Sequence, residues 1–454
     1  MKQTLLIIFL FAFLVPAFSQ QDSLLKTFKF RNSNYRAVNF SAGGSSSYDR
    51  TEFGAGPRKT AYGSGGASVN YFTAKSTDRI LYSASAGVGG NFSSGTSKDA
   101  GGKDKSNAYS FSPQVDILNK WFHKKFFTEL GATGYGEAYG SKYTTAANTV
   151  QKNSQHQYQL LLHTGIGIGR LENVTDMQNA LWLAKSLQQE KSLSRSLSAE
   201  ELNGLGRSIT MANNTRVLDG RRRTRFILQT VDDYLQQKGL VSKTDINYFS
   251  NLNDILFFAY NIPRLSGTEK FIRFTPGIYD YKSEGTQNNN ADKHQVLSTV
   301  GSLLFSVGLN KYIPTSLVHQ NNYGVALYAN YNGIDYTDRY YTGGVISMQS
   351  KSSPDLKQAG VDLFYEHAIY PNTRTTINFN LQTKAGYQDA NDQTNWFGEA
   401  YAAATWNYFI SYRTRFQATA GGMYRKNIYQ VINYLELLPN NFSLYANCGI
   451  TVSI

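Results

Sequence analysis

The stretch that decides the fold lies at residues 157–170 and reads QYQLLLHTGIGIGR. Apolar side chains occupy alternate positions, and glutamine, histidine and glycine hold most positions between them. The apolar set is Tyr158, Leu160, Leu162, Ile166 and Ile168. A period of two places the two sets on opposite faces of a β-strand. The stretch therefore predicts a strand with one apolar and one polar face.

The same alternation returns before and after this stretch, in segments long enough to cross a bilayer as tilted strands. We count about fourteen segments, and aromatic residues gather toward their ends, as in the girdles of membrane barrels. Their approximate spans are 36–46, 66–75, 79–93, 108–118, 125–139, 156–169, 268–282, 297–310, 319–333, 357–368, 374–388, 396–408, 411–424 and 441–454. The pattern predicts an all-β, antiparallel, up-and-down transmembrane β-barrel.

The links between these segments alternate in length. Short links are expected near 76–78, 119–124, 311–318, 369–373 and 409–410. Longer polar links are expected near 47–65, 94–107, 140–155, 283–296, 334–356 and 425–440. Short periplasmic turns and long extracellular loops are typical of outer-membrane barrels. We therefore expect the short links in the periplasm and the long ones outside the cell.

Composition excludes several other classes of protein. A length of 454 residues suggests about three ordinary domains, but large β-barrels run long as one unit. The chain has 32 tyrosines, 27 phenylalanines and 39 glycines but only 9 prolines, which excludes disorder and collagen. Its single cysteine, Cys448, rules out an internal disulfide and a cysteine-ligated metal site. Beyond the N-terminus, no apolar run approaches the roughly 20 residues of a membrane-spanning helix.

The N-terminus predicts export. An apolar core runs from Leu5 to Val15 and is followed by Pro16 and by small residues at Ala17 and Ser19. This order is typical of a signal peptide, with cleavage expected before Gln20. We assign 1–19 to the signal peptide and 20–169 to the first part of the barrel, about six strands.

A segment at 170–266 loses the period of two and takes up a helical period. Thr175 followed by Gln178, and Ser198 followed by Glu201, predict helices that open with capping boxes. Two further helices are expected near 217–237 and 244–260. Its position in the strand count makes this segment a periplasmic α-helical insertion, after which 267–454 completes the barrel with about eight strands.

The insertion contains a cluster of arginines. Its members are Arg216, Arg221, Arg222, Arg223 and Arg225. One interpretation is a docking face for an acidic or phosphate-bearing partner, including lipid headgroups. The other is a solvated helix face with local ion pairs. Nucleic acid is a poor partner for an exported chain, even at a net charge of +13.

A set of charged residues falls on the polar side of the strand alternation and is expected to face the lumen. Its members are Asp116, Glu129, Glu137, His163, Arg273, Asp362, Glu366, Lys384, Glu399, Arg413 and Arg415. Such charges can line a narrow pore or close it with ion pairs. The histidines occupy no recognisable nucleophile or metal-ligand spacing, so we expect neither an enzyme nor a cofactor.

As a whole the chain resembles outer-membrane β-barrel proteins of Bacteroidota-type bacteria with a periplasmic helical insertion. The resemblance rests on Ala17-Phe18-Ser19 before Gln20, on the tyrosine-rich strands, and on the passage from strand to insertion at 165–176. It implies an architecture and supplies no catalytic residues.

Two functional hypotheses follow. The first is a non-enzymatic barrel whose periplasmic helices dock with another envelope component, as an accessory or scaffold for transport, secretion or assembly. The alternative is a porin-like solute channel gated or served by the helices. Outer-membrane lipid and lipopolysaccharide are expected partners, together with a periplasmic or outer-membrane protein bound through 170–266.

Overall fold

The computed structural model describes most of the chain. The described residues are 20–29, 31, 33–53, 56–99, 102–215, 220–258, 264–287, 292–390, 393–410, 414–431, 435–437 and 440–452. The signal peptide expected at 1–19 lies outside them, as do Arg216 and Arg413.

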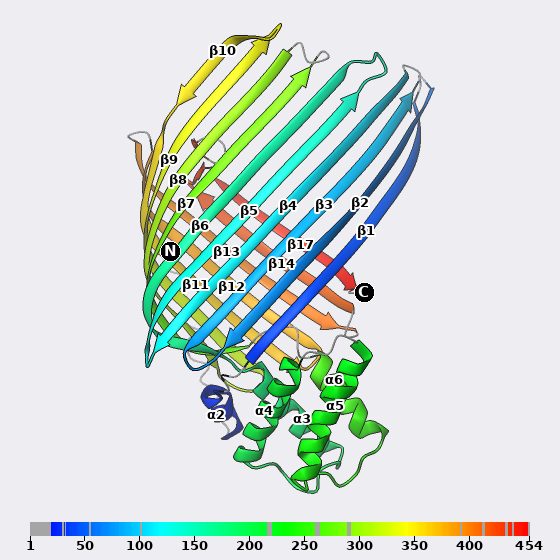
Figure 1. Ribbon diagram of the computed structural model, residues 1–454, viewed down its shortest axis with the longest axis vertical. Helices are drawn as coiled ribbons and strands as arrows, with labels where there is room; N and C mark the ends of the chain where they lie inside the picture. The colour runs from blue at the N-terminus through cyan, green and yellow to red at the C-terminus, as the bar shows by residue number, and fades with distance from the viewer. Residues whose placement is uncertain are drawn as a thin grey trace.

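One antiparallel sheet dominates the structure (Figure 1), and each strand along its path pairs with its neighbour in the chain. Its members are β1 (Ser33–Phe53), β2 (Gly56–Ser76), β3 (Ile80–Asp99), β4 (Gly102–His123), β5 (Phe126–Thr144), β6 (Val150–Asn173), β7 (Leu265–Gln287), β8 (Asp292–Pro314), β9 (His319–Thr342), β11 (Asp355–Asn372), β12 (Thr375–Ala390), β13 (Gln393–Phe409), β14 (Thr414–Lys426) and β17 (Asn441–Val452). A further strand, β10 (Val345–Ser352), pairs with β9 off this path, and β15 (Tyr429–Val431) pairs with β16 (Leu435–Leu437) separately. With β10 set aside, the 15-stranded sheet has fourteen strands in an up-and-down order, as the alternation predicts.

The long extracellular loops expected from the sequence are largely absent from the described residues, so that expectation is wrong. The links predicted at 47–65 and 94–107 are mostly strand, and pairing continues to Phe53↔Gly56 and to Asp99↔Gly102. Polar residues on both faces hide the period of two in these extensions. A ladder can nevertheless continue there, because strand pairing satisfies each backbone N–H and C=O group whatever the side chains are.

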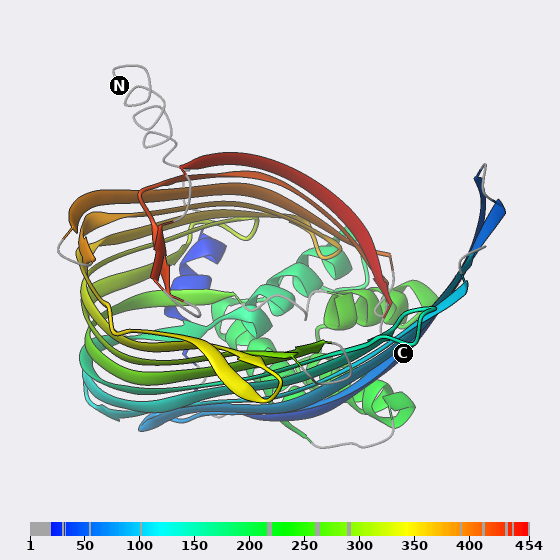
Figure 2. The same ribbon diagram turned by 90° about the horizontal axis from the view of Figure 1, so that it is seen from above.

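The sheet curls round on itself (Figure 2), with β1 and β17 as its two edges. Within the described ranges, no hydrogen-bonded pairing joins β1 to β17. Curvature brings side chains together across the concave face. Lys120 of β4 lies 2.7 Å from Glu269 of β7, although β5 and β6 lie between their strands.

The pairing register assigns each side chain to one of two unlike faces. Large apolar side chains lie exposed on the convex face, and the polar alternation lies on the concave face. Convex examples are Leu130, Leu160, Leu162, Ile272, Phe274, Val307, Leu327, Leu363, Phe379 and Leu381. Glycine makes room on the concave side, because a Cβ at Gly167 would collide with the ring of Phe127.

Between β6 and β7 the chain forms four helices. They are α3 (Thr175–Gln189), α4 (Ala199–Asn214), α5 (Gly220–Gln237) and α6 (Ile246–Phe258), preceded before β1 by α2 (Gln20–Thr27). All of them lie at one end of the sheet (Figure 1), which we call the helical end. None of the helices among the described residues is both long and apolar enough to span a membrane.

The two predicted capping boxes have different outcomes. Ser198 and Glu201 form the predicted box at the start of α4. The box predicted at Thr175 is wrong, because the N-cap of α3 is Val174, whose side chain makes no cap, and Asn173 Oδ1 accepts from the Thr175 N–H at 3.0 Å. The Thr175 hydroxyl instead accepts a hydrogen bond from the backbone N–H of Arg264, at 2.8 Å. The Thr175 side chain therefore makes a tertiary contact with the far end of the insertion, in place of the predicted capping box.

The helices share a hydrophobic core. It is built from α3 to α6 with residues such as Leu183, Leu205 and Leu235, all fully buried. Leu25 of α2 and Leu317 of the β8–β9 turn belong to the same cluster. Burial of each large apolar side chain stabilises this core by roughly 1.5–3 kcal/mol. The insertion is therefore a folded unit that packs against the helical end of the sheet.

Candidate functional site

The residues expected to face the lumen share the concave face of the sheet in the pairing register. They are Asp116, Glu129, Glu137, His163, Arg273, Asp362, Glu366, Lys384, Glu399 and Arg415. They do not form one cluster. Instead they divide between a wall built from β4 to β7 and a wall built from β11 to β14.

A buried ion cluster joins three strands of the first wall near the helical end. The Nζ atom of Lys120 lies 3.2 Å from Glu129 Oε2 and 2.7 Å from Glu269 Oε2. Arg273 binds both carboxylates at 2.9 Å. The two positive and two negative charges balance, and only Arg273 is more than slightly exposed. Removing one member would leave an uncompensated buried charge.

Aromatic rings pack beside this cluster. Phe122, Phe127 and Phe271 form a small buried group on the same wall. Lys120 Nζ lies 4.8 Å from the centre of the Phe127 ring, and the Arg273 guanidinium lies 4.0 Å from that of Phe271. Ring faces attract cations at such distances. The rings and charges therefore hold each other in place just inside the helical end.

Farther from the helical end, polar side chains bond to one another across the strands. Thr133 Oγ1 donates to Asp116 Oδ2 at 2.7 Å and lies 3.0 Å from His163 Nε2. His163 Nδ1 lies 3.3 Å from the hydroxyl of Thr275. These side chains satisfy one another's hydrogen-bonding groups, and the two ring nitrogens of His163 each lie beside a threonine hydroxyl.

Glu137 sits at a second polar contact on the same wall. Tyr135 donates to the Glu137 carboxylate at 2.8 Å, and Gln157 donates to it at 2.6 Å. The hydroxyl of Tyr279 donates in turn to Gln157 at 3.0 Å. The contact therefore links β5, β6 and β7.

The opposite wall carries separate contacts. Asn322 donates to Glu366 at 2.8 Å, and Arg425 binds Glu399 at 2.8 Å. The Nζ atom of Lys384 lies 4.5 Å from the centre of the Tyr328 ring. The remaining members are Asp362, which accepts from Gln382 at 3.5 Å, and Arg415, which pairs in register with Phe409.

A fully buried arginine anchors the insertion to the sheet. Arg264, just before β7, donates to Gln320 Oε1 at 2.8 Å and to the carbonyl oxygens of Ser316 at 2.5 Å and His319 at 2.8 Å. Its backbone N–H binds Thr175 at the start of α3. One residue therefore connects both ends of the insertion to the β8–β9 turn.

Two more contacts hold the insertion from other parts of the rim. Arg374 in the β11–β12 turn lies 2.6 Å from Asp254 of α6. The backbone N–H of Asn34 in β1 donates to Asn214 at the end of α4, at 3.1 Å. Viewed from above, several of the helices lie within the curve of the strands, and part of the insertion extends beyond it past β1 (Figure 2). The insertion is therefore held across the helical end, from both halves of the sheet.

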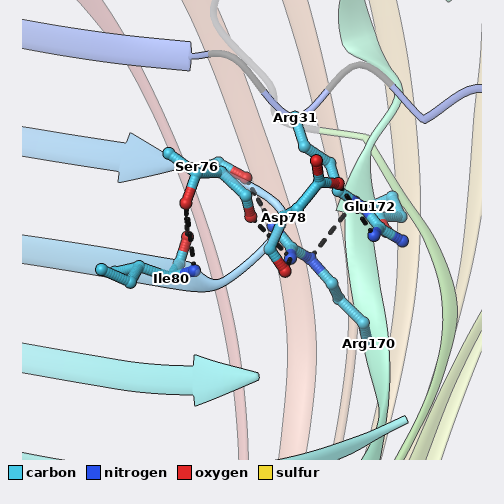
Figure 3. A network of polar contacts seen from close by, with 7 residues as sticks. Arg31, Ser76, Asp78, Ile80, Arg170 and Glu172 are labelled. Atoms are coloured by element: carbon cyan, nitrogen blue, oxygen red, sulfur yellow. Dashed lines mark hydrogen bonds and ion pairs between the residues drawn. The ribbon is translucent and has the colours of Figure 1, made fainter. Parts of the chain in front are cut away.

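A charged network secures the segment that leads into β1 (Figure 3). Arg31 binds Glu172 at the end of β6, with a shortest separation of 2.5 Å, and Asp78 in the β2–β3 turn at 3.3 Å. Arg170 donates to Ser76 Oγ at 2.7 Å and lies 3.4 Å from Glu172. These contacts fix α2 beside the insertion.

Within the insertion, a buried carboxylate joins two helices. Asp176 of α3 accepts hydrogen bonds from Thr210 at 2.6 Å and from Asn213 at 3.2 Å, both on α4. Burial raises the pKa of Asp176 above its ordinary value, although both hydrogen bonds favour the charged form. The next residue, Asn214, accepts a hydrogen bond from the backbone N–H of Asn34 in β1. The contact between α3 and α4 therefore lies one residue from a contact with the rim of the sheet.

The arginine cluster lies at the start of α5. Arg221, Arg222 and Arg225 are exposed, and Arg223 is half-buried. The described first turn of α5 contains no acidic residue. Because a helix N-terminus carries partial positive charge, cations there are not stabilised by the helix itself.

Sequence reasoning missed several of these residues. Lys120 and Glu269 lie on the same alternation as Asp116 and Arg273, so strand parity could have found them. Arg264, Asp254 and Arg374 carry no local signal, because their partners are distant in sequence. The described side chains contain no group of three or more histidine, cysteine or acidic residues placed to hold a metal ion.

Comparisons with known proteins were made for the whole chain. No family model matches it, and no curated protein matches it. Among solved structures, the ferric yersiniabactin uptake receptor FyuA from Yersinia pestis matches with 7% identity and a TM-score of 0.32. The match covers 87% of this chain and 61% of the receptor, so this chain spans less than two thirds of that receptor's length.

Proposed function

We propose that this protein is an outer-membrane transport barrel whose helical insertion is a lid over its periplasmic mouth. The observation that carries the proposal is the placement of the insertion. Anchors from β1, the β8–β9 turn and the β11–β12 turn hold it across the helical end. An insertion attached to the sheet only through its chain connections to β6 and β7 would make no contacts with other parts of the rim.

The two faces of the sheet support a membrane location. Exposed leucine, isoleucine, valine and phenylalanine cover the convex face, which is the composition that lipid requires. Charged and amide side chains occupy the concave face, which suits a water-filled or ion-paired lumen. We therefore propose that the convex face contacts the bilayer of an outer membrane.

The orientation follows from the connections. Hairpins at the end opposite the helices continue as paired strand beyond the apolar alternation, to Phe53↔Gly56 and Asp99↔Gly102, whereas strands at the helical end turn directly after it. The start of β1 and the end of β17 also lie at the helical end. Outer-membrane barrels have their short turns on the periplasmic side. On this basis the insertion is periplasmic, and the β9–β10 extension lies outside the cell.

A lid suits a transport role better than a rigid plug does. The contact between α6 and the rim is a partly exposed ion pair, and that between α4 and β1 is a hydrogen bond. Such contacts are individually weak, at about 1 kcal/mol. The side chain of Arg264 is fully buried, and its hydrogen bonds are therefore stronger than these two contacts. The insertion would stay attached at Arg264 and swing about that point.

A second candidate function is docking of an acidic envelope partner by the arginine cluster of α5. Three exposed arginines at the positively polarised end of a helix favour it. Changing Arg221, Arg222 and Arg223 to Ala should leave the barrel folded and abolish in-cell cross-links from α5 to its partner. Retention of the same cross-linked product would eliminate this candidate.

The lid is tested by planar-bilayer conductance of the intact protein and of a variant without the insertion. Replacing 174–263 with a short turn is feasible, because Asn173 and Leu265 are paired neighbours in β6 and β7. The lid proposal requires the variant to conduct more than the intact protein.

A further inference from the structure

Lysines gather on the convex face of the sheet at the end opposite the helices. Their register positions place them on the same side as the exposed rings of Phe92, Tyr109 and Tyr158. We call this set the lysine belt. Its members are Lys59 of β2, Lys98 of β3, Lys103 and Lys105 of β4, Lys142 of β5 and Lys152 of β6, all exposed.

The belt places like charges directly opposite one another. Lys98 pairs in register with Lys59 on one side and with Lys103 on the other, and Lys142 pairs with Lys152. Directly opposed like charges on neighbouring strands are destabilising. Across β2 to β6, the described carboxylates of this end, such as Asp104, fall on the concave face. The described residues of these five strands therefore supply no carboxylate to this row of ammonium groups, and Glu284 of β7 lies at its edge.

A hollow lies within the belt. It has a volume of about 600 Å³, and its charged lining residues are Lys142, Lys152, Lys293 and Glu284, with Phe92 and Tyr109 beside them. Gly140 makes room for the Tyr109 ring, because a Cβ there would collide with it. Lys293 is already paired with Glu284 at 2.9 Å, so the charge available to a ligand comes mainly from β5 and β6.

We infer that this hollow binds a phosphate group of lipopolysaccharide in the outer leaflet. The inference rests on the outer-membrane orientation proposed above, which places the belt on the external side. Ammonium groups suit phosphate, and aromatic rings at a membrane interface sit at the level of the headgroups. Lysines on five neighbouring strands match a glycolipid with several phosphates better than a free phosphate ion, which would occupy one point.

The test compares full-length protein in detergent with and without added lipopolysaccharide. We expect lipopolysaccharide to raise the thermal unfolding midpoint of the wild type. Lys142→Gln with Lys152→Gln should weaken lipopolysaccharide binding about tenfold or more, since each lysine near an anionic surface contributes appreciably. In the absence of lipopolysaccharide the same variant should be as stable as the wild type or more stable, because an opposed pair of charges is gone.

The matched control is Lys75→Gln with Lys270→Gln, which removes two exposed lysines from the same face at the helical end. It should bind lipopolysaccharide like the wild type, and Lys142→Arg with Lys152→Arg should retain binding. Equal loss in the control, or equal stabilisation by dephosphorylated lipopolysaccharide, would overturn the inference. Equal stabilisation by inorganic phosphate alone would overturn the choice of ligand. Because this experiment reads binding and the lid experiment reads conductance, each can fail without the other.

Discussion

Arg374 in the β11–β12 turn and Asp254 in α6 lie 2.6 Å apart and join the insertion to a turn three strands along the sheet from β7. Both side chains are about one third exposed, so the pair stabilises the fold by only about 1 kcal/mol or less. Its importance lies in its position. Together with Arg264 it holds the insertion on two neighbouring turns of the rim, β8–β9 and β11–β12, which the Tyr370 N–H joins by donating to the Val318 carbonyl.

Breaking this pair should free one side of the lid. Asp254→Asn with Arg374→Gln is expected to raise the open probability in planar bilayers several-fold, with little change in the free energy of unfolding of the barrel. Lys243→Gln is the matched control, because it breaks an ion pair with Asp245 that lies wholly within the insertion. Equal open probabilities in the two variants would show that the Asp254 contact does not restrain a lid.

The buried cluster should dominate the stability of the wall built from β4 to β7. Lys120→Met leaves two carboxylates to share Arg273 and should lower the free energy of unfolding by about 3 kcal/mol. The measurement is urea unfolding in detergent. Adding Glu269→Gln should recover part of the loss, since it removes the unpaired charge. An unfolding midpoint unchanged by Lys120→Met would refute the assignment of this cluster as a structural tie.

The insertion should lose stability as pH rises, through Asp176. Because the folded pKa of Asp176 is raised, its contribution is fully present below its unfolded pKa and is lost as pH rises through the folded value. Asp176→Asn should remove this dependence, so the variant gains stability relative to the wild type with increasing pH. Hydrogen exchange of α3 and α4 amides from about pH 4 to about pH 8, corrected for intrinsic rates, measures it.

The pKa of Glu201 is shifted in the opposite direction to that of Asp176, so this residue provides a contrast for the same experiment. Hydrogen bonds from Arg195 and from the backbone of Ser198 lower the pKa of Glu201 to about 2. Its contribution is present above its ordinary pKa and is lost as pH falls through the folded value. Glu201→Gln should therefore change the stability of the insertion only on the acid side of its pH profile. The same pH profile in wild type and Asp176→Asn would contradict the role given to Asp176.

The edges β1 and β17 should meet in a bilayer, because hydrocarbon cannot satisfy the unpaired backbone groups of an open edge. Cys448 of β17 is exposed and on the convex face, and it is the only cysteine of the chain. Single cysteines at Val38, Phe40, Ala42 and Gly44 of β1 share that face. At least one should form a disulfide with Cys448 in lipid. Failure at all four positions would contradict closure.

Local patterns carry much of the fold. Alternation such as Tyr158, Leu160 and Leu162 against Gln157, Gln159 and His163 predicts both the strand and the face of each residue, because successive side chains of a strand point to opposite faces. The Ser198–Glu201 box likewise depends on neighbours only. The hairpin extensions beyond Ser47 and Ser94 escape this reasoning, because their polar residues carry no face preference while their backbone pairing continues.

The candidate site was less predictable for a different reason. Strand parity predicts that Glu129 and Arg273 share a face, but their contact depends on the curvature of strands far apart in sequence. The contacts of Arg264 depend on the seating of the insertion against the β8–β9 turn, which no period in the sequence encodes. The side chains that anchor the insertion are therefore evident only from the folded chain.

The most direct test of the central claim is single-channel conductance of the refolded protein in planar bilayers, with and without residues 174–263. A lid across the mouth predicts that the intact protein is mostly silent and that steady openings appear once the insertion is replaced by a short turn. Equal, steady conductance in both forms would contradict the lid. Silence in both forms, with the sheet shown to be folded, would contradict the transport role itself and leave the docking function of α5 as the one to pursue.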